Sequence, residues 1–214
     1  MKVNHLFCAA SLIMMFQTTL SHAVSSNRGE QVFKTCVFCH GPEGAGGADA
    51  RAPSIAGMDE WYLKSQLTKF MKGIRGKHHK DNAGQRMHKI SMTMRTSDID
   101  IVSKYVAALP RPEPTISFNG DSLKGQAKFN QVCVTCHGAE GKGNQALQAP
   151  SLLGQNDWYL LLQLKNFKDK IRGGNASEDP LAAGMSGMAA TLEDEQQMKD
   201  VVYYIQKGLN KQSK

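Results

Sequence analysis

The chain has 214 residues and a formal net charge of +7, and beyond its first 23 residues no segment is apolar enough to cross a membrane, which excludes a multi-span membrane protein. Its five cysteines exclude a disulfide framework, because four of them form two Cys-x-x-Cys pairs and the fifth, Cys8, lies near the N-terminus. The charge is uneven, since residues 24–109 carry 13 Lys and Arg against 8 Asp and Glu, whereas residues 115–214 carry 11 against 10.

The N-terminal segment has the pattern of an export signal. Lys2 precedes an apolar run from Leu6 to Phe16, and small residues follow two apart at Ser21 and Ala23. This order predicts a signal peptide over residues 1–23 that is cleaved on export to the periplasm. The alternative is a retained anchoring helix, but polar residues interrupt the run and it is short for a bilayer.

Downstream, apolar residues recur at helical spacing in three stretches of each half, and no alternating strand pattern competes with them. Gly- and Pro-rich loops separate the stretches. The first predicted helix of each half runs into the first motif cysteine, from about Gly29 to Cys36 and from Gly125 to Cys133. The second helix begins after an N-cap, Asp59 or Asn156, and the third begins near Ser97 or Asp194. The expected fold is therefore all-α.

The two halves are copies of each other. Cys36, Cys39 and His40 recur 97 positions later, and a repeat this long indicates duplicated domains. The same shift pairs Pro53-Ser54 with Pro150-Ser151, Trp61-Tyr62-Leu63 with Trp158-Tyr159-Leu160, and Ile74-Arg75-Gly76 with Ile171-Arg172-Gly173. We expect domain 1 over residues 24–109, a semi-rigid Pro-rich linker over 110–119, and domain 2 over 120–214.

Each copy carries the pentapeptide Cys-x-x-Cys-His, through which c-type haem is attached. Two thiols a helical turn apart can add to the two vinyl groups of one porphyrin edge, and the next histidine can then ligate the iron. A zinc site would need two further ligands, and a thioredoxin-like dithiol would need a βαβ setting. We predict two covalent haem c groups, each wrapped by a few helices. The candidate residues are Cys36, Cys39 and His40 in the first copy and Cys133, Cys136 and His137 in the second.

The sixth ligand of each iron is predicted to be a methionine. Residues 87–94 align with residues 185–192 so that only Met87 and Met185 are methionine in both copies. A neutral thioether sulfur stabilises ferrous iron and raises the reduction potential, as suits an electron carrier. Met92 and Met188 stay open as alternatives, and methionines also commonly fill gaps in a core.

Other residues near these motifs have possible roles at the iron. His78, His79 and His88 could replace methionine at the first site, although a histidine in a basic, polar loop is more often only solvated. Pro53 and Pro150 follow the two motifs at the same distance. Each proline carbonyl is expected to accept a hydrogen bond from the second ring nitrogen of the histidine ligand.

With these motifs the sequence resembles the class I cytochromes c, and as a tandem pair it is similar to the dihaem cytochrome c4 family over nearly all of the mature chain. The resemblance implies two all-α domains related by pseudo-twofold symmetry, haems that face one another near the interface, His/Met ligation, and electron delivery to a terminal oxidase. By position, the family's haem-attaching and iron-ligating residues match Cys36, Cys39, His40, Met87, Cys133, Cys136, His137 and Met185. The chain departs from the pattern Met-x-Gly-Met, found at residues 185–188, because residues 87–90 read Met-His-Lys-Ile.

Three functions are compatible with these features. The leading prediction is a periplasmic electron carrier with no substrate chemistry of its own. Its redox partners would be a terminal oxidase, a quinol-oxidising complex or a dehydrogenase, and no nucleic-acid partner is expected. The alternative is an electron-accepting subunit of a periplasmic dehydrogenase, and the third, disfavoured by a methionine in both copies, is a dihaem peroxidase or a thiosulfate-oxidising enzyme.

The basic first half also predicts where a partner docks. Neutralising Lys72, Arg75, Lys77 and Lys80 is expected to change the salt dependence of electron transfer if this half docks an acidic partner. Peripheral association with the inner membrane surface, or a merely soluble surface, are the other readings of this charge.

Overall fold

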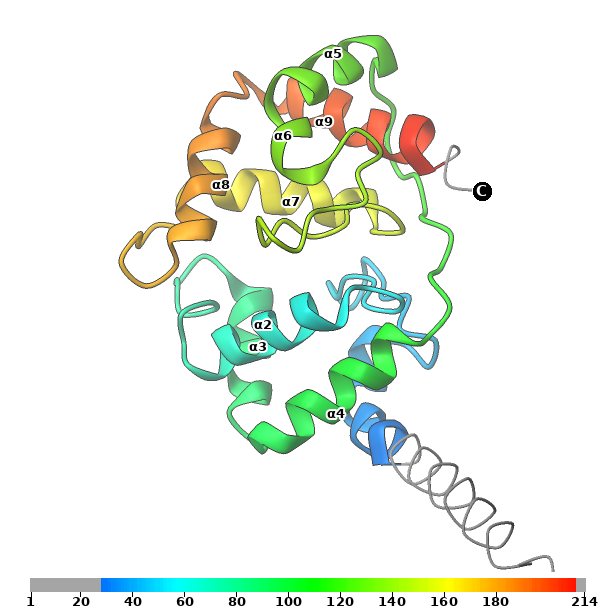
Figure 1. Cartoon of the computed structure of the whole chain (residues 1–214), viewed down its shortest axis with the longest axis vertical. Helices are drawn as coiled ribbons and strands as arrows, with labels where there is room; N and C mark the ends of the chain where they lie inside the picture. The colour runs from blue at the N-terminus through cyan, green and yellow to red at the C-terminus, as the bar shows by residue number, and fades with distance from the viewer. Residues whose placement is uncertain (1–27, 211–214) are drawn as a thin grey trace, which may run out of the picture.

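The computed structural model of the protein describes residues 28–210, which form two helical lobes placed one above the other (Figure 1). Within these residues the only β-pairing is two isolated bridges, Gly47 with Ala52 and Asn144 with Ala149. The predicted all-α fold is therefore confirmed. The predicted signal peptide and Cys8 lie outside the described residues.

The first lobe is built around contacts between its first and last helices. It consists of a helix over residues 28–40, α2 (Glu60–Met71), α3 (Asn82–Ser91) and α4 (Thr96–Ala107). The rings of Phe33 and Tyr105 lie 5.5 Å apart, and Val102 and Val106 are buried in the same core. Gly29 permits this close approach, because a Cβ atom there would lie 2.6 Å from the Cβ of Tyr105.

The second lobe repeats this packing. It consists of α5 (Ser122–Val132), α6 (Val134–His137), α7 (Asp157–Lys168), α8 (Pro180–Ala190) and α9 (Glu195–Tyr204), which continues as a π-helical turn over Ile205–Leu209. The rings of Phe129 and Tyr204 lie 5.6 Å apart, and a Cβ atom on Gly125 would lie 2.9 Å from the Cβ of Tyr204. The sequence repeat is thus a structural repeat as well.

Each lobe has a helix that the sequence analysis missed, α3 in the first lobe and α8 in the second. The sequence of α8 is rich in Gly, Ala and Ser, and that of α3 is mostly polar, so both carry too few large apolar residues to show a clear helical period. Their starts are nevertheless encoded: Asp81 accepts a hydrogen bond from the backbone N–H of Gly84, and Asp179 accepts one from that of Ala182. Pro180 at the first helical position is a further start signal.

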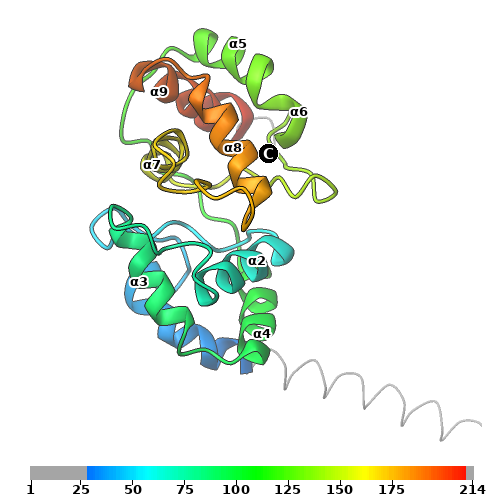
Figure 2. The same cartoon turned by 90° about the vertical axis from the view of Figure 1, so that its left-hand side faces the viewer.

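The predicted N-caps Asp59 and Asn156 do precede α2 and α7, but neither side chain caps its helix. Each crosses to the other lobe instead: the Asn156 Oδ1 accepts from the backbone N–H of Ser54 at 2.7 Å, and the Asp59 Oδ2 accepts from that of Ser151 at 3.4 Å. Both views of the chain place α2 and α7 on the facing sides of the two lobes (Figures 1 and 2). These polar side chains therefore join the lobes.

Candidate functional site

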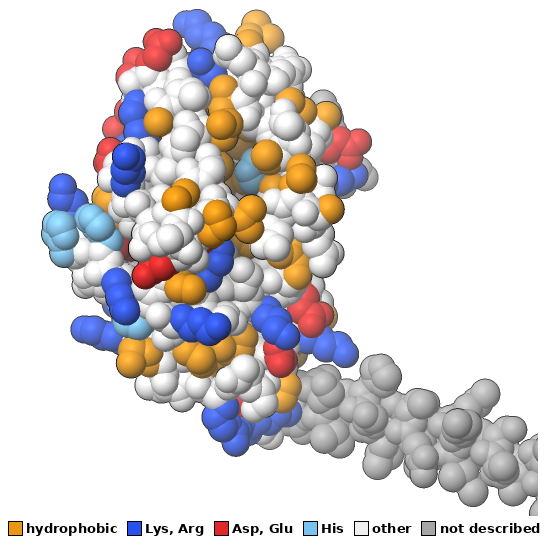
Figure 3. Space-filling view, turned by 60° about the vertical axis from the view of Figure 1, so that its left-hand side comes forward, with side chains coloured by type: hydrophobic (Ala, Val, Ile, Leu, Met, Phe, Trp, Pro, Cys, Tyr) orange, Lys and Arg blue, Asp and Glu red, His pale blue; other side chains and the backbone are white. Residues whose placement is uncertain are grey.

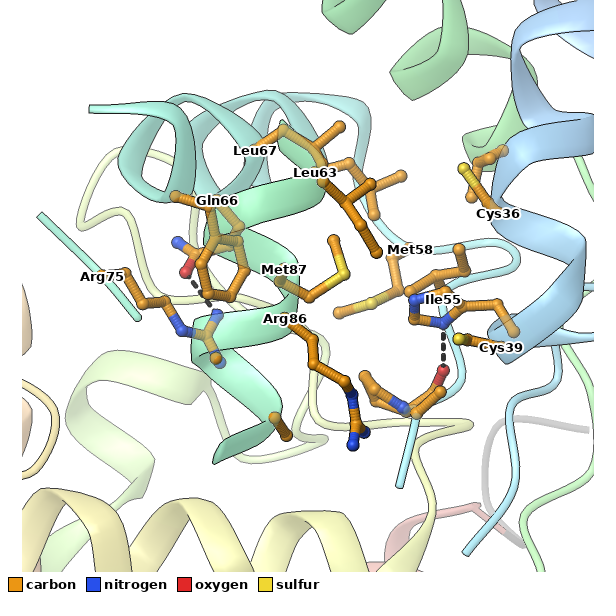
Figure 4. A pocket seen from close by; sticks show the side chains of 18 of the residues that line it. Cys36, Cys39, Ile55, Met58, Leu63, Gln66, Leu67, Arg75, Arg86 and Met87 are labelled. Atoms are coloured by element: carbon orange, nitrogen blue, oxygen red, sulfur yellow. Dashed lines mark hydrogen bonds between the residues drawn. The ribbon is translucent and has the colours of Figure 1, made fainter. Parts of the chain in front are cut away.

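The chemistry-bearing residues of the first lobe meet in one crevice (Figure 4). Cys36, Cys39 and His40 line it from the helix over residues 28–40, and Met87 lines it from α3. Its empty volume is about 1280 Å³, counted out to the open solvent at its mouth. Most of the wall is apolar, with Ile55, Met58, Leu63, Leu67, Phe70, Met94, Val102 and Val106 among its residues. The crevice is thus a largely apolar slot with two thiols, one imidazole and three thioethers on its walls.

The histidine of each motif is held in the orientation that iron ligation requires. The Nδ1 of His40 lies 2.9 Å from the carbonyl oxygen of Pro53, and the Nδ1 of His137 lies 2.9 Å from that of Pro150. The hydrogen bonds predicted for the two prolines are thus confirmed. Burial lowers the pKa of both histidines, and the bonds to the carbonyls only partly offset this. Each ring is therefore neutral, with Nδ1 as the donor and Nε2 left as a ligand.

No disulfide joins the four motif cysteines. Burial raises the pKa of Cys36, and burial together with Cys136 raises the pKa of Cys133 to about 11, so the two more buried thiols are neutral. Cys136 is exposed at the surface of the second lobe. In each motif the thiols are three residues apart on helical backbone, which places them about one turn from each other, as attachment to one porphyrin edge needs.

The methionines considered as iron ligands differ in how far they are buried. Met87 lines the crevice, and its side chain points into the space beside Met58 and Leu63 (Figure 4). Met185 packs against buried residues of the second lobe, whereas Met92 is 60% exposed and Met188 is 45% exposed. The structure therefore favours Met87 and Met185 over the two alternatives. Met58 also lines the crevice, but the sequence did not indicate it as an iron ligand. Its counterpart in the second copy is Gln155, not a methionine.

None of the three histidines considered as substitutes lines the first crevice. His78 and His79 stack on each other, with ring centroids 4.6 Å apart. The Nδ1 of His88 lies 2.5 Å from the carbonyl oxygen of Phe70 at the end of α2. In the second lobe the hydroxyl of Ser186 donates to the equivalent carbonyl of Phe167 at 2.7 Å. The residue after each candidate methionine therefore ties its helix to the helix before it.

We expect His88→Ala to loosen α3 and to destabilise the first lobe by about 0.5–1.5 kcal/mol, the usual net value of one hydrogen bond. His88→Asn should retain most of this stability, since its amide nitrogen is as far from the backbone as Nδ1 and can donate to the same carbonyl. Thermal unfolding of the two variants measures the difference. Equal melting temperatures for the alanine variant and the unmodified protein would show that the bond does not hold α3.

Arg75 and Arg172, which occupy equivalent positions of the repeat, form a polar cluster between the lobes that we call the arginine cluster. Arg75 donates to Gln66 at 2.7 Å within its lobe, and across the interface to the hydroxyl of Tyr159 at 2.9 Å and to Gln163 at 3.2 Å. The second lobe mirrors this set, because Arg172 donates to Gln163 at 2.8 Å, to Gln66 at 2.9 Å and to Tyr62 at 3.2 Å. Arg75 is therefore part of the interface, and its inclusion among the surface docking residues was wrong.

The arginine cluster has an excess of positive charge. Each guanidinium lies 4.5 Å from the centroid of a phenylalanine ring, Phe70 or Phe167, and no carboxylate in residues 28–210 forms an ion pair with either arginine. The Nε of Arg75 is buried without a hydrogen-bond partner. Burial opposes ionisation of Tyr62, but Arg172 and Arg75 outweigh it and lower the pKa of that phenol.

The buried carboxylate of Asp81 lines the same crevice and acts electrostatically on Arg75, but it forms no ion pair with it. Two buried cations with so little opposite charge are costly, so the arginine cluster is suited to a group that brings its own negative charge. Gln66, Arg75, Tyr159 and Gln163 also line the first crevice, which places the cluster at one of its ends. A porphyrin with carboxylate side chains fits this arrangement, with its apolar ring in the slot and its carboxylates toward the arginines. After the Nε of Arg75, the hydroxyl of Ser103 is a second buried polar group on the crevice wall that has no hydrogen-bond partner.

Comparison with known proteins agrees with this geometry. The family model described as cytochrome c matches the chain twice, over residues 26–110 and 122–208. A thiosulfate dehydrogenase electron acceptor from Thiomonas intermedia is 32% identical over 76% of this chain and 73% of its own length. The cbb3-type cytochrome c oxidase subunit FixP from Bradyrhizobium diazoefficiens is 32% identical over 67% of this chain and 50% of that protein. The solved structure of cytochrome c4 from Acidithiobacillus ferrooxidans superposes with a TM-score of 0.64 at 26% identity, over 81% of this chain and 98% of that one.

Proposed function

Because this chain belongs to the cytochrome c family, as two tandem domains of the cytochrome c4 type, we propose that it is an electron carrier of the periplasm with two covalent haem c groups. The domains would span residues 24–109 and 120–214, joined by the linker over 110–119, once residues 1–23 are removed. The observation that carries the proposal is the repeated histidine geometry, with Nδ1 bound to a proline carbonyl and Nε2 left free in each lobe.

The residues that would hold each haem follow from the site. Cys36 and Cys39, and Cys133 and Cys136 in the second lobe, would form the thioether bonds. His40 and Met87 would bind the first iron, and His137 and Met185 would bind the second. Bound haem supplies an iron that changes between the ferrous and ferric states by one electron. The arginine cluster would bind the haem carboxylates and thereby keep both haem edges close to the interface.

The chain's own residues have little to do beyond positioning. The apolar wall of the first crevice excludes water, and the carbonyls of Pro53 and Pro150 fix both histidine rings. Met87 and Met185 would each supply the sixth ligand of an iron, which would leave no open position for a substrate. The proposal is therefore transfer of single electrons between redox proteins, without substrate chemistry. No helix in residues 28–210 is long and apolar enough to span a membrane.

Two classes of partner are supported. Delivery to a terminal oxidase is our first choice, supported by the likeness to the oxidase subunit FixP and to cytochrome c4. The second candidate is a subunit that accepts electrons from a periplasmic dehydrogenase, and the likeness to a thiosulfate dehydrogenase electron acceptor favours it. Both need the same two haems, so co-purification of a dehydrogenase chain is the observation that would separate them.

The test is an absorption spectrum of the matured protein in both oxidation states, with the haem quantified per chain. We expect two haems and a far-red sulfur-to-ferric-iron band of two-site strength. A Cys36→Ser/Cys39→Ser variant should retain one haem, while Cys8→Ser should retain both as the matched control. A high-spin component in the unmodified protein would mean an open iron and would favour the peroxidase or thiosulfate-oxidising alternative.

A further inference from the structure

The mouth of the first crevice is basic. Arg51 and Arg86 both line it, and the Nη2 of Arg86 donates to the carbonyl of Ala50 at 2.8 Å, which places it beside Arg51. Lys89 is three residues further along α3 and so lies on a neighbouring part of that helix. All three side chains are exposed. We call Arg51, Arg86 and Lys89 the basic rim.

The charges of the basic rim are free to act on a partner. Among residues 28–210, no carboxylate forms an ion pair with any of the three. The exposed lysines Lys72, Lys77 and Lys80, in the loop before α3, also lack an ion pair and extend the positive surface. In the second lobe, by contrast, several surface lysines are neutralised locally. These pairs are Lys124 with Asp121, Lys142 with Glu140, and Lys165 and Lys199 with Glu195.

The second lobe does not repeat this charge. In the alignment of the two copies, Arg51, Arg86 and Lys89 correspond to Gln148, Gly184 and Gly187. Lys72, Lys77 and Lys80 correspond to Asp169, Gly174 and Ser177. Six positively charged residues of the first lobe thus correspond to neutral or acidic residues in a lobe of the same fold. The fold and the haem motif do not require these cations, because the second lobe has both without them.

One apolar side chain of α3 lies beside the basic rim, and a second is exposed in the first haem motif. Ile90 lines the mouth of the crevice, is 38% exposed, and follows Arg86 by one helical turn on the same face of α3. Phe38, inside the first haem motif, is 95% exposed, and its counterpart is Thr135. Figure 3 shows Lys and Arg side chains spread around hydrophobic ones on the lower lobe. An apolar centre with a charged border is the usual anatomy of a protein interface.

We propose that the basic rim docks an acidic redox protein at the first crevice, so that this partner exchanges electrons through the first haem, while the second lobe serves a partner that is not recognised by negative charge. The inference rests on the proposed function and adds the chemistry of one partner. A redox protein suits the rim better than a lipid surface, because the rim borders the opening through which the first haem edge would be approached. Electrostatic attraction would raise the association rate and would be screened by salt.

The test compares electron transfer from the acidic soluble domain of cytochrome b5, used as the probe, at low and high ionic strength. The rim variant Arg51→Gln/Arg86→Gln/Lys89→Gln is compared with Lys124→Gln/Lys142→Gln/Lys165→Gln, which loses the same three charges from the second lobe. We expect the rim variant to lower the second-order rate roughly tenfold at low salt and to flatten its salt dependence. The control should lower the rate less than about twofold.

Two results would overturn the docking inference. If both variants change the rate equally, the effect is that of net charge, and the docking inference fails. If the rim variant releases the protein from phosphatidylglycerol vesicles while leaving the transfer rate unchanged, the rim binds a membrane surface instead and the inference also fails. Haem content and the far-red band are recorded on every preparation, so failure of the proposed function would be seen there, independently of the rates.

Discussion

Met87→Ala and Met185→Ala are each expected to remove half of the far-red sulfur-to-ferric-iron band and to lower the reduction potential of one haem. The reason is that a neutral thioether stabilises ferrous iron, and that axial ligands can move haem potentials over about 0.8 V. The double variant should lose the band completely. Haem content should stay at two per chain, since the thioether bonds and the proximal histidines are untouched.

The matched controls are Met92→Leu and Met188→Leu, which conserve volume at side chains that are 60% and 45% exposed. They should leave the band and both potentials as they are. Met58→Leu is a further control in the first lobe, because this sulfur also lines the crevice. A band that survives Met87→Ala but is lost in Met58→Leu or Met92→Leu would move the first iron's ligand to the other methionine.

Replacing Arg75 by leucine is expected to have the largest effect on stability. The change leaves three acceptors at the interface without their donor, those of Gln66, Tyr159 and Gln163, and each unsatisfied buried group costs about 1–3 kcal/mol. Because Gln66 and Gln163 also accept from Arg172, the losses will not add fully, and we expect about 2–4 kcal/mol in total. Loss of positive charge beside the haem carboxylates should also lower the haem potentials.

Arg75→Lys should recover little of this stability, since an ammonium cannot reproduce the fork of donors that contacts three partners. Arg95→Gln is the control. It removes one cation of the same lobe, but Arg95 lies at the surface, where its pair with Asp98 contributes little to stability. Chemical unfolding and potentiometric titration of the three variants measure both effects. Similar losses in Arg75→Leu and Arg95→Gln would mean that the arginine cluster does not hold the lobes together.

The sequence predicted the parts of this protein that depend on local chemistry. The repeat of Cys-x-x-Cys-His, the apolar helical spacing and the aligned methionines are read along the chain, and they led to the all-α class and to the cytochrome c family. The prolines after each motif were also placed correctly, because a residue at a fixed distance in both copies is a strong positional signal. The helices α3 and α8 were not predicted, because the residues that they bury are glycine, alanine and serine, which leave no hydrophobic period along the sequence.

Residue types and their order along the chain were thus enough to identify two cytochrome c domains and to predict the residues that would bind haem. Which charges face a partner could not be read from the chain, since a charged residue looks the same whether it lies on the surface or between lobes. Arg75 and the lysines at 72, 77 and 80 are close in sequence, yet the arginine is bonded across the interface and the lysines are exposed. Long-range packing makes that distinction, because it brings α7 against α2 and so gives Arg75 partners that lie 84 and 88 residues away.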